Sequence, residues 1–385
     1  MKQVLFPEVV WFQEGPGVRN TQYTDSGVKL LNVANLVDGR VDLSNTDRYI
    51  SEEEAYGKYK HFLVDDGDFI IASSGIKVEY FDKKMGFVSG AQLPLCMNTS
   101  TIRFKVLDKN ILDIRYFMYF LKTDQFKQQL SREITGSAQL NFGPSHLKKM
   151  HLPLIDLTEQ RKIAAVLDKV SDLIAKRHQQ LTKLDELVKA RFVEMFGDRV
   201  ANEKHWDRKA LQECATFFNG KAHEQVIDEK GQYILVTSKF IASNQKEYRK
   251  TNEILFPLHR GDICMVMSDV PNGRALAKCV LIDQDNKYTL NQRICCFRGY
   301  EMNAIFLLYM LNRHEYFLSF DDGDSQTNLR KKDILACPII FPPFKLQNQF
   351  AAFVEQTDKT KTTIKHSLDK LETLKKALMQ KYFGE

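Results

Sequence analysis

The sequence contains an internal duplication that constrains its fold more than any other feature. Residues 136–198 align without a gap with residues 323–385, at a constant offset of 187 positions (323 − 136 and 385 − 198). The matches include Gln160 with Gln347, and both copies end in Phe-Gly followed by an acidic residue. A chain of 385 residues also fits two domains better than one. We therefore expect two related halves that perform the same kind of task.

Each copy runs into a long helix-forming segment, 156–197 and 343–385, whose apolar residues recur at alternating steps of three and four. This spacing is typical of coiled-coil helices, and Thr158 is expected to be the N-cap of the first one. An amphipathic helix often only covers a core, but two copies in matching register favour two helices packed against each other. The predicted seam comprises Ile163, Leu167, Val170, Ile174, Leu181, Leu184 and Val188 in the first helix, and Phe350, Val354, Ile364, Leu368, Leu371 and Leu378 in the second.

The blocks that precede the helices, 1–155 and 198–342, alternate short β-rich runs with Gly, Asn and Asp turns. In both blocks a Gly-Asp pair precedes a strand and one amphipathic patch follows. We therefore predict two diverged copies of one α+β module. The expected strands are Val28–Val33, Phe69–Ala72, Ser100–Phe104, Tyr233–Val236, Asp262–Met267 and Arg293–Phe297, and the expected helical patches are Asp113–Gln129 and Asn303–Leu318.

The composition bounds the classes of function. A net charge of +6 and a pI near 8.7 permit nucleic-acid binding but do not demonstrate it. No apolar run approaches the roughly 18–20 residues that a membrane span needs, and the N-terminus lacks the pattern of a secretory signal. The seven cysteines form no CxxC pair, which indicates reduced, mostly buried thiols. We expect a cytoplasmic protein that makes no membrane contact.

The sequence carries no catalytic motif. Gly220-Lys221 lacks the other residues of a phosphate-binding loop, and Gly15-Pro16-Gly17 lacks the preceding strand and the third glycine of a dinucleotide fingerprint. Phe341-Pro342-Pro343-Phe344 is similar to the Asn/Asp-Pro-Pro-Tyr/Phe motif of DNA adenine methyltransferases, but a phenylalanine cannot accept a hydrogen bond from the target amine. No set of histidines and cysteines has zinc spacing. We therefore predict that the chain is not an enzyme.

Two stretches of the first repeat copy resemble a known family. Gly-Ser-Ala-Gln-Leu-Asn (136–141), then Pro-Leu-Ile-Asp-Leu-Thr-Glu-Gln-Arg-Lys-Ile-Ala (153–164) and a long helix, resemble the conserved region of specificity subunits of Type I restriction–modification enzymes. The second copy keeps Gln347 but has Leu346 where the first has Glu159. Trp-Asp-Arg-Lys-Ala-Leu (206–211) is similar to the start of a target recognition domain. The resemblance covers essentially the whole chain.

The resemblance implies an α+β fold with an internal pseudo-twofold repeat. Target recognition domains at 1–155 and 198–342 would be separated by two long helices, 156–197 and 343–385, that form an antiparallel coiled coil. It also implies a non-catalytic subunit that reads a bipartite, asymmetric DNA target and directs adenine methylation and restriction by its partners. The partners would be double-stranded DNA, two methyltransferase subunits and two restriction/translocase subunits. The chain itself would hold no cofactor, since S-adenosylmethionine would bind the methyltransferase subunits, and ATP and Mg the restriction subunits.

DNA sequence is read mainly by arginine contacts to guanine and by asparagine or glutamine contacts to adenine, whereas lysine and arginine contacts to phosphates only position the protein. Candidates expected on loops are Lys77, Asn98, Arg103, Gln139 and Asn141 in the first block, and Asn272, Arg274, Asn291, Gln292, Arg293, Gln326 and Asn328 in the second. Because Gln139 and Asn141 recur as Gln326 and Asn328, these four favour loop shaping or backbone contact. The alternative function is a two-domain coiled-coil scaffold without DNA base readout.

Overall fold

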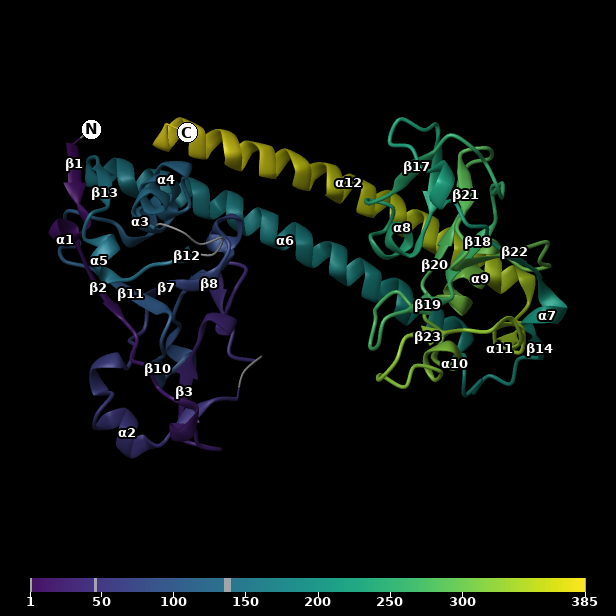
Figure 1. The fold of residues 1–385 in the computed structure, drawn as a ribbon, viewed down its shortest axis with the longest axis horizontal. Coiled ribbons are helices and arrows are strands. Elements are labelled where there is room, and N and C mark those ends of the chain that lie inside the picture. The colour runs from purple at the N-terminus through teal and green to yellow at the C-terminus, as the bar shows by residue number, and fades with distance from the viewer. Residues whose placement is uncertain (1, 45–46, 135–139, 385) are drawn as a thin grey trace. The chain divides into compact units, whose positions relative to one another are not determined.

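The computed structural model describes residues 2–44, 47–134 and 140–384 (Figure 1). The chain divides into two compact units. Unit 1 comprises Met1–Lys176 and Leu368–Glu385, and unit 2 comprises Arg177–Ser367. Each unit therefore contains one variable block together with part of each long helix. No helix of the described residues is long and apolar enough to cross a membrane.

Unit 1 is built on one four-stranded antiparallel sheet and several smaller sheets. The four-stranded sheet has the order β2 (Val10–Glu14), β11 (Thr101–Val106), β7 (Phe69–Ala72) and β9 (Met85–Phe87). A three-stranded sheet has the order β10 (Leu95–Met97), β3 (Val28–Leu31) and β6 (Tyr49–Ile50). The two-stranded pairs are β1 (Lys2–Leu5) with β13 (His151–Leu154), β8 (Ser74–Ile76) with β12 (Leu140–Asn141), and β4 (Leu36–Val37) with β5 (Arg40–Val41).

Unit 2 repeats this arrangement strand for strand, except that β4 and β5 have no counterpart. Its four-stranded sheet has the order β15 (Thr216–Asn219), β22 (Ile294–Arg298), β18 (Ile263–Val266) and β20 (Cys279–Leu281). The three-stranded sheet has the order β17 (Arg249–Thr251), β16 (Tyr233–Val236) and β21 (Tyr288–Leu290). The pairs are β14 (Arg208–Ala210) with β24 (Pro338–Ile340), and β19 (Ser268–Asp269) with β23 (Thr327–Asn328). The prediction of two diverged copies of one α+β module is confirmed.

Each predicted helical patch is two helices rather than one. Asp113–Gln129 folds as α3 (Ile114–Leu121) and α4 (Asp124–Glu133), because Thr123 is in an extended conformation and its hydroxyl accepts a hydrogen bond that caps α4. His314 separates α9 (Ala304–Leu311) from α10 (Glu315–Leu318) in the same way. The other short helices are α1 (Phe6–Val9), α2 (Glu52–Tyr56) and α5 (Pro144–Leu147) in unit 1, and α7 (Leu211–Cys214), α8 (Ser238–Ala242) and α11 (Lys331–Leu335) in unit 2.

The cores explain why the central strands are apolar on both faces. All four residues of β7 are fully buried and belong to one core cluster with residues of α3 and β10. In unit 2, Phe192, Phe196, Phe306 and Phe350 pack in a cluster with ring centroids 4.8–5.8 Å apart, which joins both long helices to α9. Six of the seven cysteine thiols are buried and the seventh is half-buried, so these residues act as small apolar side chains.

The long helices are α6 (Leu157–Phe196) and α12 (Phe344–Phe383). Within unit 2 they run antiparallel, since Phe192 contacts Phe350 while Asp185, one to two turns earlier in α6, pairs with Lys361 at 2.7 Å. Every predicted seam position on both helices is buried or half-buried. The N-cap prediction is wrong by two residues: α6 begins before Thr158, and the carboxylate of Asp156 accepts the hydrogen bond from the Thr158 N–H at 2.8 Å.

The repeated glutamines tie the start of each long helix to the shorter helix beside it. Buried Gln160 accepts a hydrogen bond from the N–H of Asp113, the N-cap of α3, at 2.9 Å and donates to the carbonyls of Ile111 and Ile155. Gln347 accepts from the N–H of Asn303, the N-cap of α9, at 2.9 Å and donates to the Pro342 carbonyl. The duplicated glutamine is therefore a structural residue in both units.

We expect Gln347→Ala to lower the free energy of unfolding of unit 2 by about 2–3 kcal/mol, because it leaves buried polar groups of Asn303 and Pro342 without partners. Gln349→Ala is the matched control, since Gln349 is exposed on the same helix. Denaturant titration of both variants measures the difference. Equal stabilities of the two variants would show that Gln347 does not anchor α12.

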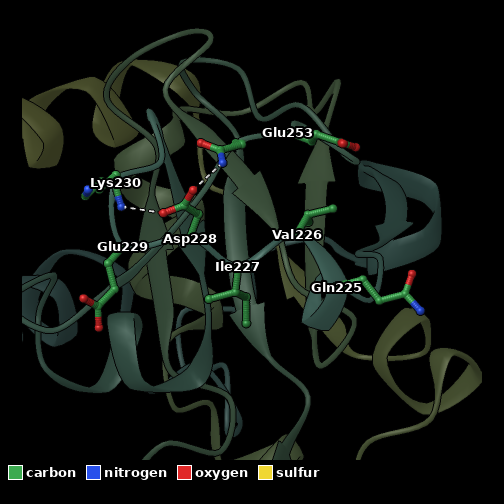
Figure 2. A pocket seen from close by; sticks show the side chains of 8 residues that line it. Gln225, Val226, Ile227, Asp228, Glu229, Lys230 and Glu253 are labelled. Atoms are coloured by element: carbon green, nitrogen blue, oxygen red, sulfur yellow. Dashed lines mark hydrogen bonds between the residues drawn. The ribbon is translucent and has the colours of Figure 1, made fainter.

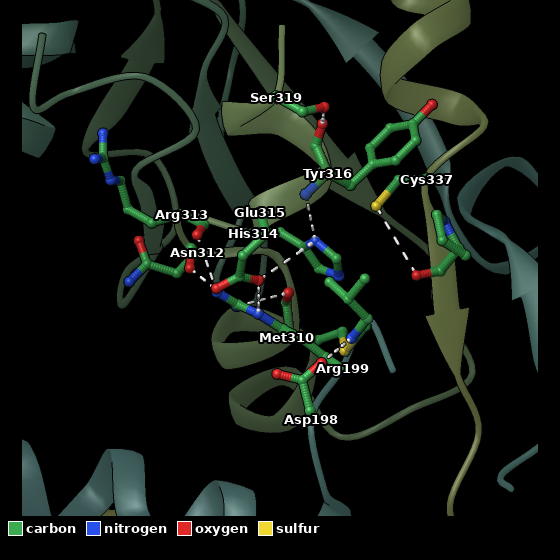
Figure 3. A network of polar contacts seen from close by, with 12 residues as sticks. Asp198, Arg199, Met310, Asn312, Arg313, His314, Glu315, Tyr316, Ser319 and Cys337 are labelled. Atoms are coloured by element: carbon green, nitrogen blue, oxygen red, sulfur yellow. Dashed lines mark hydrogen bonds and ion pairs between the residues drawn. The ribbon is translucent and has the colours of Figure 1, made fainter. Parts of the chain in front are cut away.

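A polar network at the end of α9 holds unit 2 together beyond its apolar core (Figure 3). The guanidinium of Arg199 donates to both carboxylate oxygens of Glu315, at 2.8 and 3.1 Å. It also donates, at 2.9–3.1 Å, to the carbonyl oxygens of Tyr309, Met310, Asn312 and Arg313. The last carbonyls of a helix have no partners within the helix, so Arg199 supplies the missing donors for α9.

His314 lies fully buried beside this network (Figure 3). Its Nδ1 accepts a hydrogen bond from the Tyr316 N–H at 3.0 Å and so caps α10, while its Nε2 has no partner among the described residues. Burial lowers the pKa of His314 to about 4, and the charge of Arg199 adds to the shift, whereas Glu315 and Asp198 oppose it. Protonation is therefore unfavourable in the folded chain.

Unit 2 should lose stability as the pH falls from about 6.5 toward about 4, because in that window the unfolded chain binds a proton at His314 that the folded chain does not. Between pH 7.5 and pH 5 the expected loss from this group is about 2 kcal/mol. His314→Asn retains a side-chain acceptor for the Tyr316 N–H but does not titrate. Denaturant titrations at both pH values should show a smaller loss for His314→Asn than for the natural chain; identical losses would contradict the assignment.

Candidate nucleic-acid interface

Three segments of unit 1 that are distant in sequence meet at Ser73, between β7 and β8. The N–H of Ser73 donates to the carbonyl of Ser100 at 2.8 Å, and its carbonyl accepts from the N–H of Phe142 at 2.9 Å. Ser100 directly precedes β11, and Phe142 directly follows β12. The turn before β11, the start of β8 and the end of β12 therefore lie side by side.

Unit 2 forms the same junction at Met267, between β18 and β19. The N–H of Met267 donates to the carbonyl of Arg293 at 3.1 Å, and its carbonyl accepts from the N–H of Leu329 at 2.8 Å. The strands after the junction also correspond, since Asn141 lies opposite Ser74 in unit 1 and Asn328 lies opposite Ser268 in unit 2. The two units can thus be compared position by position at this surface.

A glycine and an asparagine form the shared framework of the junction. A Cβ added to Gly15 would fall 2.1 Å from the carbonyl oxygen of Asn98, and one added to Gly220 would fall 2.1 Å from that of Asn291. Only glycine permits this approach of two backbones. The sequence carried no sign of this packing role, because each glycine meets a partner more than 70 residues away.

Asn98 lies on the loop between β10 and β11, as expected, but its side chain faces the interior. Its side chain is 2% exposed. Its Oδ1 accepts hydrogen bonds from the Val18 and Thr99 N–H groups, and its Nδ2 donates to Asn32. Asn98 therefore joins three segments of unit 1 and has no side-chain face left for a ligand.

The expectation of a loop is wrong for Arg103, which lies within β11 and is 5% exposed. Its guanidinium pairs with Asp68 at 3.0 Å, donates to the carbonyls of Leu63 and His61 at 2.7 and 3.0 Å, and lies 5.1 Å from the Trp11 ring. Asp68 belongs to the first Gly-Asp pair. Both Gly-Asp pairs are thus structural turns with buried carboxylates.

In unit 2 the corresponding carboxylate, Asp262, pairs with Arg298 at 2.6 Å. Each aspartate also accepts the N–H of the residue three positions before it, at 2.8 Å.

The remaining candidates of unit 1 lie at the junction. Lys77 is exposed directly after β8, and Asn141 is exposed at the end of β12. Gln139 lies outside the described residues. Thr99 and Ser100, which the sequence did not single out, are exposed and half-exposed on the adjoining turn, and Ser100 has a positive φ of 65°.

The turn that follows β21 carries three candidates of unit 2. Asn291 is half-buried, and its side chain accepts a hydrogen bond from the Arg293 N–H at 3.2 Å. Gln292 is exposed and donates to Glu224 at 3.3 Å. The side chain of Arg293 is exposed. Asn291 therefore shapes the turn that presents Gln292 and Arg293.

The other four candidates of unit 2 surround the β19–β23 pair, and all are exposed. Gln326 donates to the Ser268 hydroxyl at 2.8 Å, and Asn272 donates to the Gly323 carbonyl at 3.1 Å. Asn328 lies in β23, and Arg274 lies on the loop after β19. All seven candidates of unit 2 thus lie on segments that adjoin the junction.

The junctions share a framework but differ in the side chains that they expose. Thr99 and Ser100 of unit 1 occupy the positions of Gln292 and Arg293 in unit 2, since each pair follows the framework asparagine. Arginine and glutamine can form paired hydrogen bonds with guanine and adenine edges, while threonine and serine offer one hydroxyl each. The two surfaces are therefore suited to different base sequences.

Unit 2 also has a depression that includes none of the junction residues and whose charged lining is mainly acidic (Figure 2). Asp228, Glu229 and Glu253 line it, with Lys230 and other polar residues. The Asp228 carboxylate accepts the Lys230 N–H at 2.8 Å, and this bond holds its pKa below the usual range. An acidic lining repels phosphates, so this surface is unsuited to a nucleic acid backbone.

Comparison with known proteins agrees with the repeated architecture. The family described as "Type I restriction modification DNA specificity domain" matches residues 23–185 and again residues 203–373. The type I restriction enzyme MjaVIII specificity subunit of Methanocaldococcus jannaschii is 24% identical over 190 residues, which are 48% of this chain and 43% of that protein. The chain thus spans less than half the length of this curated relative.

Two solved structures share the fold over 99% of this chain. The S subunit of the type I restriction–modification system from M. genitalium aligns over 95% of its length, with a TM-score of 0.55 and 16% identity. A chain from a structure of complex assembly and conformational transition in the type I R-M system aligns over 96%, with a TM-score of 0.56 and 14% identity. The two family matches cover most of the sequence, and the chain therefore belongs to the type I restriction–modification DNA specificity domain family and carries its domain twice.

Proposed function

We propose that the chain is the specificity subunit of a type I restriction–modification enzyme and that each unit reads one half of a split, asymmetric DNA target. The observation that supports this most strongly is the repeated junction. The framework pairs Gly15 with Asn98 and Gly220 with Asn291, while the residues exposed next to it differ. One scaffold with two sets of exposed side chains is what reading two different half-sites requires.

Binding and base reading would use different side chains at these surfaces. Arg293 and Gln292 supply the groups that recognise base edges in unit 2. Lys77 and Arg274 supply positive charge for phosphates, which positions the duplex without specifying sequence. Asn141 and Asn328 are identical and occupy equivalent strand positions, so they serve the shape of the junction or contact the DNA backbone.

Family membership makes this chain the non-catalytic component, so the chemistry falls to partner chains. In this proposal two methyltransferase subunits bind S-adenosylmethionine and methylate adenine at the site that the chain selects. Two restriction/translocase subunits bind ATP and Mg and cleave DNA whose site is unmodified. The fold shared with a chain from a study of type I complex assembly supports such partnerships.

Selection from a random DNA pool tests base reading against a purely scaffolding role. The chain, assembled with its methyltransferase partner, is incubated with duplexes of random sequence, and bound DNA is sequenced. We expect enrichment of two short motifs separated by an unspecified gap, with an affinity that falls steeply as salt rises. Retention of DNA without any enriched motif would contradict the proposal and favour the scaffold.

A further inference from the structure

The segment Val270–Leu276, which links β19 to the strand β20, is exposed yet extensively tied down. Val270 is 63% exposed, and Pro271, Asn272 and Arg274 are exposed beside it. Only its end is buried, where Leu276 enters the core of unit 2. We call residues 270–276 the β19 loop.

Asp269, at the end of β19, holds the β19 loop in one conformation. Its Oδ1 accepts the Val270 N–H at 2.9 Å, and its Oδ2 accepts the N–H groups of Ala275 and Leu276 at 2.6 and 3.0 Å. The carboxylate thus closes the loop from its first residue to its last two. A Cβ at Gly273 would lie 2.1 Å from this carboxylate, so the loop requires glycine there.

Two further contacts fix the β19 loop from outside. Asn272 donates to the Gly323 carbonyl at 3.1 Å, which joins the loop to the segment before β23. Arg313 donates to the carbonyls of Gly273 and Leu276, both at 3.3 Å. An exposed loop held by a carboxylate, an amide and a guanidinium keeps its tip in one position.

Unit 1 has no such loop. Gly75 stands where unit 2 has Asp269, because Ser74 and Ser268 occupy equivalent positions opposite the shared asparagines. The chain after β8 instead forms a 3-10 helix, Val78–Lys83, that buries Phe81 in the core. The β19 loop is therefore particular to the second domain, as a determinant of one half-site must be.

We propose that Asp269 is a positioning residue for DNA reading by unit 2: it fixes the β19 loop so that Val270 contacts the methyl group of a thymine in the major groove. This inference rests on the proposed function, and it names one base contact within it. An apolar side chain beside the thymine methyl distinguishes thymine from the other bases. The loop starts three residues beyond Met267, directly after β19, and the N–H of Met267 donates to the carbonyl of Arg293, so the start of the loop lies near the turn that carries Arg293.

Uracil lacks only the methyl group of thymine and is therefore the direct probe. The target is first identified from the methylated sites of the natural complex. Duplexes in which each thymine of the target is replaced in turn by deoxyuridine are then bound to complexes of the natural chain, Val270→Ala, Asp269→Asn and Asp228→Asn. Asp228 is the matched control, since its carboxylate organises an exposed turn of the same unit within the acidic depression.

We expect one thymine whose replacement weakens binding of the natural chain by about fourfold, the effect of losing one buried methyl group. At that position Val270→Ala should bind the thymine and deoxyuridine duplexes equally. Asp269→Asn should lose most of the discrimination between thymine and deoxyuridine. The melting temperature of Asp269→Asn is measured in parallel to check that the variant folds. Asp228→Asn should retain the full effect.

A target without thymine, or discrimination by Val270→Ala equal to that of the natural chain, would overturn the inference. Because Val270 is exposed, its replacement tests the contact even if Asp269→Asn fails to fold. Absence of any methylated two-part site would instead refute the proposed function itself.

Discussion

Replacing Arg199 with alanine should lower the free energy of unfolding of unit 2 by about 3–5 kcal/mol. The side chain is 16% exposed and donates to four carbonyl oxygens at the end of α9 as well as to Glu315. Without it these carbonyls lose their partners in a region that water reaches poorly. Denaturant titration of the natural chain and the variant measures the change.

Arg249→Ala is the matched control, because Arg249 is exposed on β17 of the same unit and should change stability by less than about 0.5 kcal/mol. Arg199→Lys should recover only part of the loss, since an ammonium group cannot span the carbonyls that the guanidinium fork reaches. If Arg199→Ala and Arg249→Ala were equally stable, the network in Figure 3 would not contribute to the fold.

Under the proposed function, lengthening both long helices by one heptad should widen the gap between the two half-sites of the proposed DNA target and leave both half-sites unchanged. The insertions belong after Lys176 in α6 and after Ser367 in α12, where the two units divide. Seven residues keep the seam in register and add about 10 Å of helix, or about three base pairs at 3.4 Å each. Sequencing of the methylated sites in cells that express either the natural chain or the lengthened chain, each with its partners, measures the gap.

A variant in which the seven residues at the same place are exchanged for another heptad of equal length serves as the control and should keep the natural gap. A changed half-site sequence after insertion, with an unchanged gap, would show that the helices do not set the spacing. The prediction concerns the helices alone and is independent of which bases either unit reads.

The helices and the duplication could be predicted from the sequence because both are periodic. Seam residues such as Leu167 and Val188 recur at helical spacing, and burial of that spacing follows from helix geometry. The split at Thr123 lies where four polar residues (122–125) interrupt the apolar run between Leu121 and Phe126. The prediction treated them as the polar face of one helix, whereas the hydroxyl of Thr123 caps a second helix there.

The candidate site was predicted less well, since exposure of a polar residue depends on distant segments. Asn98 is buried because Gly15 brings another backbone within contact, and Arg103 is buried because Asp68 is available to pair with it. Neither partner is near its residue in the sequence. Residues of unit 2 such as Arg293 and Arg274 do lie on exposed turns. A nearby Asn or Gly in the sequence predicts such a turn, so the exposure of these arginines could be predicted locally.

Thr99 and Ser100 carried no signal of their own, because small hydroxyl residues occur on turns of every kind. Their place at the surface emerges only when unit 1 is aligned with unit 2 through the shared asparagine and glycine. In a duplicated chain, the structure of one half therefore identifies candidate positions in the other.

Single-molecule sequencing of methylated adenines tests the central claim most directly. The chain is expressed with its methyltransferase partner in cells that lack other adenine methylation, and methylated sites across the genome are aligned. Reading by two units predicts one motif made of two different short half-sites separated by a fixed number of unspecified base pairs. A single contiguous motif, or no methylation that depends on this chain, would contradict the account.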